Sequence, residues 1–139
     1  MTPTMIRRAI RDSNELKRQY FRLAGQAHNA GDYVQAHKFT QLGNENAAYG
    51  KMALALLKEE VQSNVDIDLH CLSVHQAIDV LYSVLSFHKR STGRQIRFIT
   101  GRGAHSEGGV AKIKQATVQL LKNNGYRFRV FEGHVVVET

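Results

Sequence analysis

The sequence has a single cysteine, a single proline and no tryptophan. Because Cys71 has no second cysteine to pair with, the chain holds neither a disulfide framework nor a multi-cysteine zinc site, which favours a reducing compartment. No apolar run approaches the ~20 residues of a membrane-spanning helix, and the N-terminus lacks the apolar core of a secretory signal. We therefore expect a soluble, cytoplasmic protein with no membrane association. Arg7, Arg8 and Arg11 leave a mitochondrial presequence open as an alternative, although carboxylates among the next residues break its acid-poor pattern.

A chain of 139 residues fits one domain of ordinary size with an appendage, at ~100–200 residues per domain. Its 19 Lys and Arg residues against 12 Asp and Glu give a net charge of +7. That excess is typical of proteins that bind polyanions such as nucleic acids, and the alternative is a generally basic, soluble surface. Residues 1–64 and residues 65–139 each contain more basic than acidic side chains, so charge alone does not locate a binding surface.

The first part of the chain, residues 1–64, is predicted to be an antiparallel helical hairpin. Helical spacing over residues 12–30 places one group of side chains on a common face, and a similar group follows up to about residue 62. Gly31 suits the end of the first helix, while Asp32 and Gln35 form a capping-box pattern for the second. The expected inward residues are Leu16, Tyr20, Leu23, Ala27 and Ala30, then Phe39, Leu42, Tyr49, Ala53 and Leu56. The many small residues between them predict close helix packing and a thin core.

The second part, residues 65–139, changes to a two-residue period, which is typical of strands. Segment 65–70 alternates apolar and polar side chains, and Ser73 with Gln76 forms a capping box for the next helix. A second strand over 95–100, a glycine-rich stretch over 101–109, a helix and two further strands follow. The order β-α-β-α-β-β predicts a two-layer α/β domain.

One edge of this sheet is the expected binding site. The first two strands should be parallel, joined by a helical crossover, so their carboxyl ends meet at the same edge. That edge receives His70 from the first strand and residues 101–106 from the second. Glycine-rich backbone before a helix N-terminus can hold a phosphate, and Arg102 adds a planar guanidinium that matches phosphate oxygens. The alternative is a turn that needs glycine for its geometry alone.

His70 is the candidate acid–base group, because an imidazole moves protons near neutral pH. Asp68, two residues earlier on the same strand face, is positioned to orient it. The alternatives are a histidine that caps local backbone, or a solvated polar face. A metal site of Asp66, Asp68 and His70 is disfavoured, since three ligands from one straight strand diverge. His105 offers a second acid–base group or a phosphate contact, or is a solvated loop residue.

Arg127 and Arg129 alternate along the third strand and predict a basic strand face that can follow a nucleic-acid backbone. The neighbouring aromatic residues Tyr126, Phe128 and Phe131 are predicted to lie in the core rather than to stack on bases, since no RNA-binding strand motif surrounds them.

Three segments together resemble the Smr (small MutS-related) domain, in the form found in eukaryotic CUE–Smr-type proteins: DLHCLSVHQAI, TGRGAHSEGGVAKIKQATVQLL and GHVVVE. The resemblance covers residues 65–139, and the hairpin is similar to the helical domain that often precedes Smr. It implies a fold like the C-terminal domain of bacterial translation initiation factor three, and nuclease activity. The family usually has Gly after its motif histidine, where this chain has Cys71, which leaves a weakened or non-cleaving domain open.

The resemblance, together with the residue analysis, gives two sets of site residues. The expected catalytic residues are Asp68, His70 and Arg102. The expected phosphate- or nucleic-acid-binding residues are Gly101, Gly103, His105, Ser106, Lys112, Arg127 and Arg129. No metal or other cofactor is expected.

The function that the resemblance implies is that of an RNA endonuclease which cuts mRNA at stalled or collided ribosomes. It would leave 2′,3′-cyclic phosphate and 5′-hydroxyl ends by metal-independent acid–base chemistry. The alternatives are a module that binds RNA or the ribosome without cleaving, and a DNA-nicking endonuclease. The expected partners are RNA and the ribosome, with DNA as the alternative, and the chain is expected to be a monomer.

Overall fold

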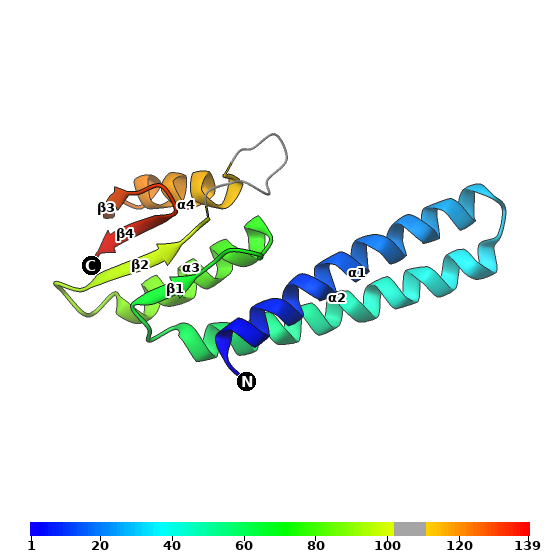
Figure 1. The fold of residues 1–139 in the computed structure, drawn as a ribbon, viewed down its shortest axis with the longest axis horizontal. Coiled ribbons are helices and arrows are strands. Elements are labelled where there is room, and N and C mark those ends of the chain that lie inside the picture. Colours follow the sequence, from blue (N-terminus) through cyan, green and yellow to red (C-terminus); the bar gives the residue numbers. More distant parts are fainter. Residues whose placement is uncertain (102–110) are drawn as a thin grey trace. The chain divides into compact units, whose positions relative to one another are not determined.

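A computed structural model describes residues 1–101 and 111–139 (Figure 1). The described chain forms two compact units, Met1–Leu57 and Lys58–Thr139. The elements in chain order are α1 (Pro3–Asn29), α2 (Tyr33–Val61), β1 (Asp66–Asp68), α3 (Val74–His88), β2 (Gln95–Ile99), α4 (Lys112–Asn123), β3 (Arg127–Val130) and β4 (His134–Glu138). This order confirms the predicted helical pair followed by a β-α-β-α-β-β domain. Within the described ranges, no helix combines the length and the apolar character that crossing a membrane requires.

The first helix begins at Pro3, whereas the sequence pattern predicts helical spacing only from residue 12. Thr2 is its N-cap, and the Thr2 hydroxyl oxygen accepts a hydrogen bond from the Met5 amide at 3.2 Å. Proline at the first helical position has no amide hydrogen to leave unsatisfied, and its fixed φ suits a helix start. The cap-and-proline pair therefore starts the helix earlier than apolar periodicity alone indicates.

The helix seam of the hairpin, the line along which α2 is most buried, is formed by residues spaced by seven, most of which are small. The seam consists of Ala36, Gly43, Gly50 and Leu57. A Cβ atom placed on Gly43 would lie only 2.4 Å from the ring of Phe21 on α1. Ser13 on α1 donates from Oγ to the Asn46 carbonyl oxygen of α2 at 2.5 Å, so the two helices pack closely. The predicted close packing through small residues is confirmed.

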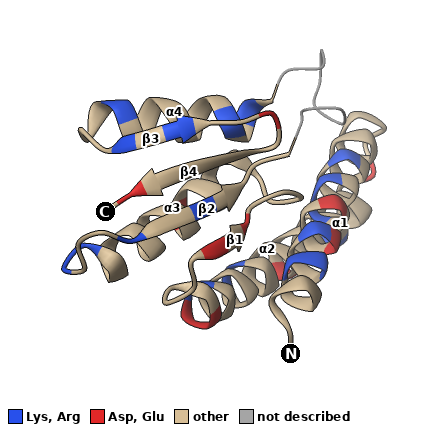
Figure 2. Ribbon diagram, turned by 60° about the vertical axis from the view of Figure 1, so that its left-hand side comes forward, with Lys and Arg blue, Asp and Glu red and all other residues tan. Residues whose placement is uncertain are grey.

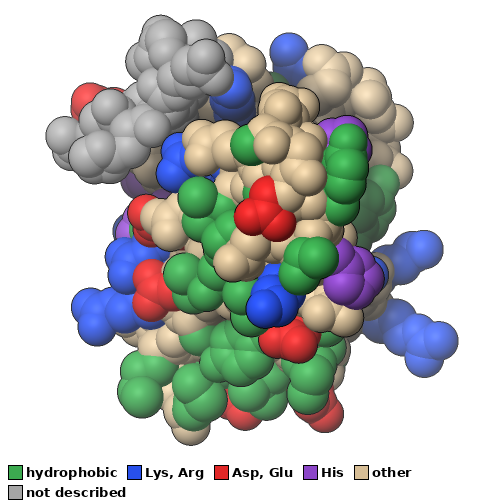
Figure 3. All heavy atoms as spheres, turned by 90° about the vertical axis from the view of Figure 1, so that its right-hand side faces the viewer, with side chains coloured by type: hydrophobic (Ala, Val, Ile, Leu, Met, Phe, Trp, Pro, Cys, Tyr) green, Lys and Arg blue, Asp and Glu red, His purple; other side chains and the backbone are tan. Residues whose placement is uncertain are grey.

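The predicted inward face of α2 was wrong, because the most buried line of this helix runs through Ala36, Gly43 and Gly50 and not through its larger hydrophobic residues. Leu42, Tyr49 and Leu56 are 37%, 53% and 37% exposed, and Leu16 on α1 is 40% exposed. Close approach of the two backbones leaves the larger side chains at the margins of the seam. Figure 3 shows hydrophobic side chains reaching the surface among charged ones on the face it presents.

The second unit contains a four-stranded sheet in the order β1-β2-β4-β3. Strands β1 and β2 are parallel, as predicted, and the other two neighbouring pairs are antiparallel. Helix α3 starts with the predicted capping box, in which Ser73 and Gln76 exchange hydrogen bonds of 2.9 and 3.2 Å. His88, near the end of α3, is fully buried, and its Nε2 lies 2.9 Å from the Asn64 carbonyl oxygen.

The two faces of the sheet differ in burial. One face carries the buried side chains Ile67, Leu69, Ile96, Phe98, Val135 and Val137, and α3 and α4 pack together as the second layer (Figures 1 and 2). Alternation along each strand turns the intervening residues to the opposite face. We call this the open face, and most of its side chains are polar or charged and at least partly exposed.

Candidate active site

Three segments that are distant in sequence meet at the carboxyl edge, which we define as the edge of the sheet where β1 and β2 end. The Leu69 amide donates to the Ile99 carbonyl at 2.8 Å, which joins the end of β1 to the end of β2. The amides of Thr100 and Gly101 both donate to the Gly133 carbonyl, at 3.1 and 3.2 Å. The β3–β4 turn therefore lies beside the residues that follow β2. The site is formed by three chain segments, whereas the sequence predicts two.

His70 and Asp68 form a hydrogen-bonded pair at this edge. One carboxylate oxygen, Oδ1 of Asp68, lies 2.5 Å from His70 Nδ1 and accepts from the His70 amide at 3.0 Å. Donation from Nδ1 to a carboxylate sets the neutral tautomer with its lone pair on Nε2, and the negative charge stabilises the imidazolium that forms when Nε2 takes a proton. The His70 side chain is 50% exposed and that of Asp68 26%, so the pair is within reach of a solvent-borne substrate.

Cys71 adopts a left-handed backbone conformation with φ of +70°, and it is the one non-glycine residue with positive φ in the described part of the chain. A side chain in this region strains the backbone, whereas glycine enters it without strain. The thiol is exposed. The position thus has the geometry that suits glycine, and it directly follows the candidate acid–base residue.

Gly101 lies next to His70, since a Cβ atom added to Gly101 would be 3.9 Å from the His70 Cβ. Its φ of +80° is again a conformation that favours glycine. Of the glycine-rich stretch, this residue is the one the structure places at the predicted edge. The other expected residues of that stretch, Arg102, Gly103, His105 and Ser106, lie outside the described residues.

The start of α4 contributes cations and backbone donors. Its N-cap, Ala111, makes no side-chain capping bond, and the first turn has no acidic residue. The early amides of a helix attract anions when no side chain caps them. Lys112, one of the predicted phosphate-binding residues, is exposed at this start. Lys114, which the sequence analysis missed, donates from Nζ to the Glu132 carbonyl at 3.0 Å and so fastens α4 to the β3–β4 turn.

Asp66 forms an ion pair with Arg97 and does not join Asp68 and His70, the other two residues of the disfavoured metal site. Its two carboxylate oxygens accept from Arg97 Nε and Nη2 at 3.1 and 2.9 Å, across the β1–β2 pair. The hydrogen bonds and the charge of Asp66 raise the pKa of Arg97 above its already high ordinary value, so Arg97 stays charged. Among residues 1–101 and 111–139, no three His, Cys, Asp or Glu side chains gather closely enough to hold a metal ion.

The expected basic strand face lies on the open face of the sheet. Arg127 and Arg129 are exposed on β3, and Figure 2 shows basic positions on β3 and α4 and acidic ones on β1. Phe131 corrects an expectation: it is 41% exposed and not in the core, because it continues the alternation of the two arginines and not that of the buried Val135. The two-residue alternation of the strand predicts that Phe131 lies on the same face as Arg127 and Arg129. Here this alternation decides its exposure, and the general tendency of aromatic residues to be buried does not.

The α/β unit with an Asp–His pair at its carboxyl edge matches a known domain. A profile of the Smr domain matches residues 67–134. The chain is 31% identical to an Smr domain-containing protein of Schizosaccharomyces pombe over 94% of its length and 68% of that protein. This chain belongs to the Smr family, with an N-terminal helical region before the Smr domain.

Two further relatives share mainly the Smr part. NEDD4-binding protein 2 of Homo sapiens is 36% identical over 58% of this chain and 4% of that protein. Endonuclease NBR9 of Saccharomyces cerevisiae is 32% identical over 52% of this chain and 30% of that protein. The chain therefore spans less than a third of either, and one distant relative in the family is an endonuclease by name.

Proposed function

We propose that this chain is an endoribonuclease whose acid–base group is His70. The observation that carries the proposal is the Asp68–His70 pair, held at an exposed edge beside Gly101. An imidazole with Nδ1 fixed to a carboxylate is the arrangement that accepts a proton at Nε2 and stabilises the resulting charge. The family membership and the net charge of +7 support a nucleic-acid substrate.

The proposed reaction uses the 2′-hydroxyl of RNA as the nucleophile. His70 Nε2 takes the 2′-hydroxyl proton, the 2′-oxygen bonds to phosphorus, and the bond from phosphorus to the 5′-oxygen breaks. The 5′-oxygen leaves with a proton from water or from a second acid, for which the sequence offers His105. Arg102 and loop amides would stabilise the added charge on the pentacoordinate phosphorus. The products are a 2′,3′-cyclic phosphate and a 5′-hydroxyl end.

By family resemblance, the proposed cellular substrate is mRNA on stalled or collided ribosomes, and the proposed location is the cytoplasm. A second candidate is a module that binds RNA without cleaving it. Cys71, which stands where the family usually has glycine, favours this alternative, because it adds an exposed side chain directly after His70 that narrows the approach of a substrate.

The test is cleavage of an end-labelled single-stranded RNA in EDTA. His70→Ala should lower the rate by about 10²–10⁴-fold, the usual contribution of a general acid or base, with little change in affinity. His75→Ala is the matched control, since His75 is exposed on α3 outside the pair. A single 2′-deoxy substitution at the cut site should block cleavage there. Products with 5′-phosphate ends, or activity lost in EDTA, would contradict the proposed chemistry. Cleavage of DNA at the same rate as RNA would favour the DNA-nicking alternative.

A further inference from the structure

At its carboxyl end the open face of the sheet carries one row of side chains, one from each strand region. Strand pairing sets Asp68 opposite Ile99, and Ile99 opposite His134. The Phe131 amide donates to the His134 carbonyl at 2.9 Å, which extends the row to Phe131 beyond β3. The row therefore runs from the Asp68–His70 pair, across β2, to an aromatic residue on the far side of the sheet.

The far end of the row is a stacked pair of rings. The centroids of Phe131 and His134 are 4.6 Å apart and their planes differ by only 9°. Phe131 is 41% exposed, so the pair reaches solvent where an aromatic residue in the core would not. A flat, solvent-exposed ring is the surface on which a nucleobase stacks, and the stacking needs no particular base.

The turn that holds these rings is fixed in place before any ligand binds. Its Gly133 carbonyl accepts from both Thr100 and Gly101, and its Glu132 carbonyl accepts from Lys114 Nζ. The turn is thus bonded to both β2 and α4. A ring held in this way loses little conformational freedom on binding, which favours affinity.

The charge around the rings suits a polyanion. The Arg129 guanidinium lies 5.9 Å from the centre of the Phe131 ring, and Arg127 lies two residues earlier on the same face. Within the described residues neither arginine is paired with a carboxylate, unlike Arg97 in the middle of the face. At ~3.3 Å per residue, the line from Arg127 to Phe131 is ~13 Å long, enough to follow more than one phosphate.

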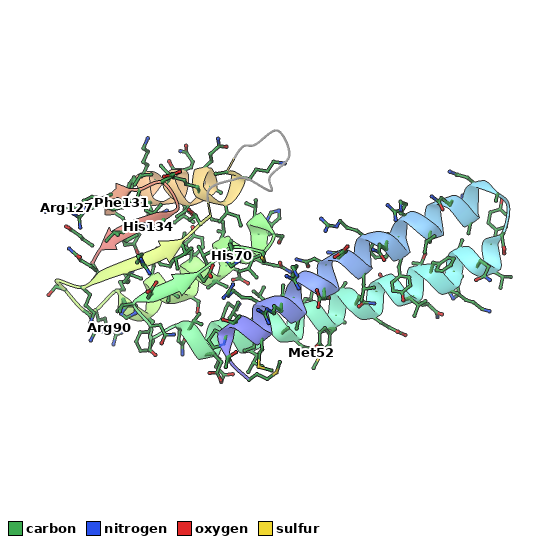
Figure 4. All side chains as sticks on the ribbon, viewed as in Figure 1. Met52, His70, Arg90, Arg127, Phe131 and His134 are labelled. Carbon is green, nitrogen blue, oxygen red and sulfur yellow. The ribbon has the colours of Figure 1, made fainter. Side chains whose placement is uncertain are left out.

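The rings lie a short distance across the sheet from the candidate acid–base group. Three steps between neighbouring strands, at ~4.8 Å each, separate Asp68 from Phe131, which is ~14 Å in all. Figure 4 shows Phe131 and His134 together, with Arg127 on the same side of the unit and His70 across from them.

We propose that the Phe131–His134 stack, flanked by Arg127 and Arg129, binds an unpaired base of single-stranded RNA whose scissile phosphate lies at His70. The base contact follows from the rings and charges themselves, while the place of the scissile phosphate rests on the proposed function. Bases in a duplex already stack on each other and are not available to an added ring. The stack therefore selects single strands over duplexes.

The experiment measures binding of a single-stranded RNA that carries one 2-aminopurine, in the His70→Ala background so that cleavage does not interfere. Stacking quenches 2-aminopurine fluorescence. Phe131→Leu should remove the quenching and weaken affinity by about 5–150-fold, the range expected for one base–aromatic contact. Phe131→Tyr should retain both. The matched control is Phe87→Leu on α3, because Phe87 is also exposed, at 50%, and its ring lies edge-on to that of His88 with the centroids 5.2 Å apart.

Two further comparisons separate the stack from a purely structural role. The first uses an RNA with an abasic site in place of 2-aminopurine. The His70→Ala protein should bind this RNA as weakly as the His70→Ala/Phe131→Leu protein binds the 2-aminopurine RNA. Adding Phe131→Leu should not weaken binding of the abasic RNA further. The duplex form should bind more weakly than the single strand and respond little to Phe131→Leu. Unchanged binding and quenching in Phe131→Leu would overturn the stack, even if His70 proves essential for cleavage. Absence of cleavage by the wild type, with Phe131-dependent quenching intact, would overturn the proposed function and leave the base contact standing.

Discussion

Cys71 is the one non-glycine residue in the described part of the chain with a positive φ, which is +70°. A left-handed conformation costs a residue with a Cβ about 1–2 kcal/mol, and glycine avoids that strain at the expense of a more flexible unfolded chain. We expect Cys71→Gly to raise the free energy of unfolding by about 0.5–1 kcal/mol. Urea denaturation monitored by circular dichroism measures the change.

Cys71→Ala is the matched control for that substitution. It removes the exposed thiol and keeps the Cβ, so its stability should stay within about 0.5 kcal/mol of the wild type, as for other surface substitutions. Equal stabilisation by both variants would mean that the thiol, and not the backbone conformation, is the unfavourable feature.

At the scale of the helices, two glycines in the hairpin have opposite surroundings. A Cβ on Gly25 in α1 would meet nothing within 4 Å, while one on Gly43 in α2 would lie 2.4 Å from Phe21. Alanine is favoured over glycine inside a helix by about 0.8–1 kcal/mol. We therefore expect Gly25→Ala to raise the thermal midpoint of the helical signal, and Gly43→Ala to lower it because the added methyl displaces Phe21 from the seam. A gain from both variants would show that the helices can move apart without loss.

The same two helices show what a hydrophobic pattern reveals about an element and what it does not. In half-buried strands such as β1, the face of each side chain follows directly from alternation, so the sequence predicts it well. In α2 the buried line is made of Ala36, Gly43 and Gly50, which contribute closeness and little apolar area. A method that follows Leu and Tyr finds the margins of such a seam. Phe131 failed for a related reason, since residue type was weighed above its place in the strand.

At the scale of the whole molecule, the sequence predicted the meeting of Asp68, His70 and Gly101, because parallel neighbouring strands must end at one edge. It did not predict that the β3–β4 turn would close the third side. That contact depends on β4 lying between β2 and β3, an order that residue patterns do not specify. The candidate acid–base pair was therefore accessible from local spacing, while the stacked rings required the register of three strands.

The net charge of the chain is spread over both units, with eight basic and four acidic residues in 1–57 and eleven and eight in 58–139. A polyanion is therefore attracted to the molecule generally, and a specific path must be found by comparing positions. The path proposed here predicts that Arg127 and Arg129, on the open face of β3, contact phosphates, and that basic residues outside this face do not. Arg90 and Arg94 follow α3 at the opposite end of β2, where they are exposed.

Salt dependence distinguishes these two pairs of arginines. Each phosphate contact to a single strand contributes about −0.7 to the slope of log affinity against log salt concentration, because bound counterions are released. We expect the double variant Arg127→Gln/Arg129→Gln to make the slope for a single-stranded RNA shallower by about 1.4. The double variant Arg90→Gln/Arg94→Gln removes the same net charge and should leave the slope nearly unchanged. Equal changes in both would mean that RNA responds to the total charge of the molecule, and that β3 is not its path to the Asp68–His70 pair.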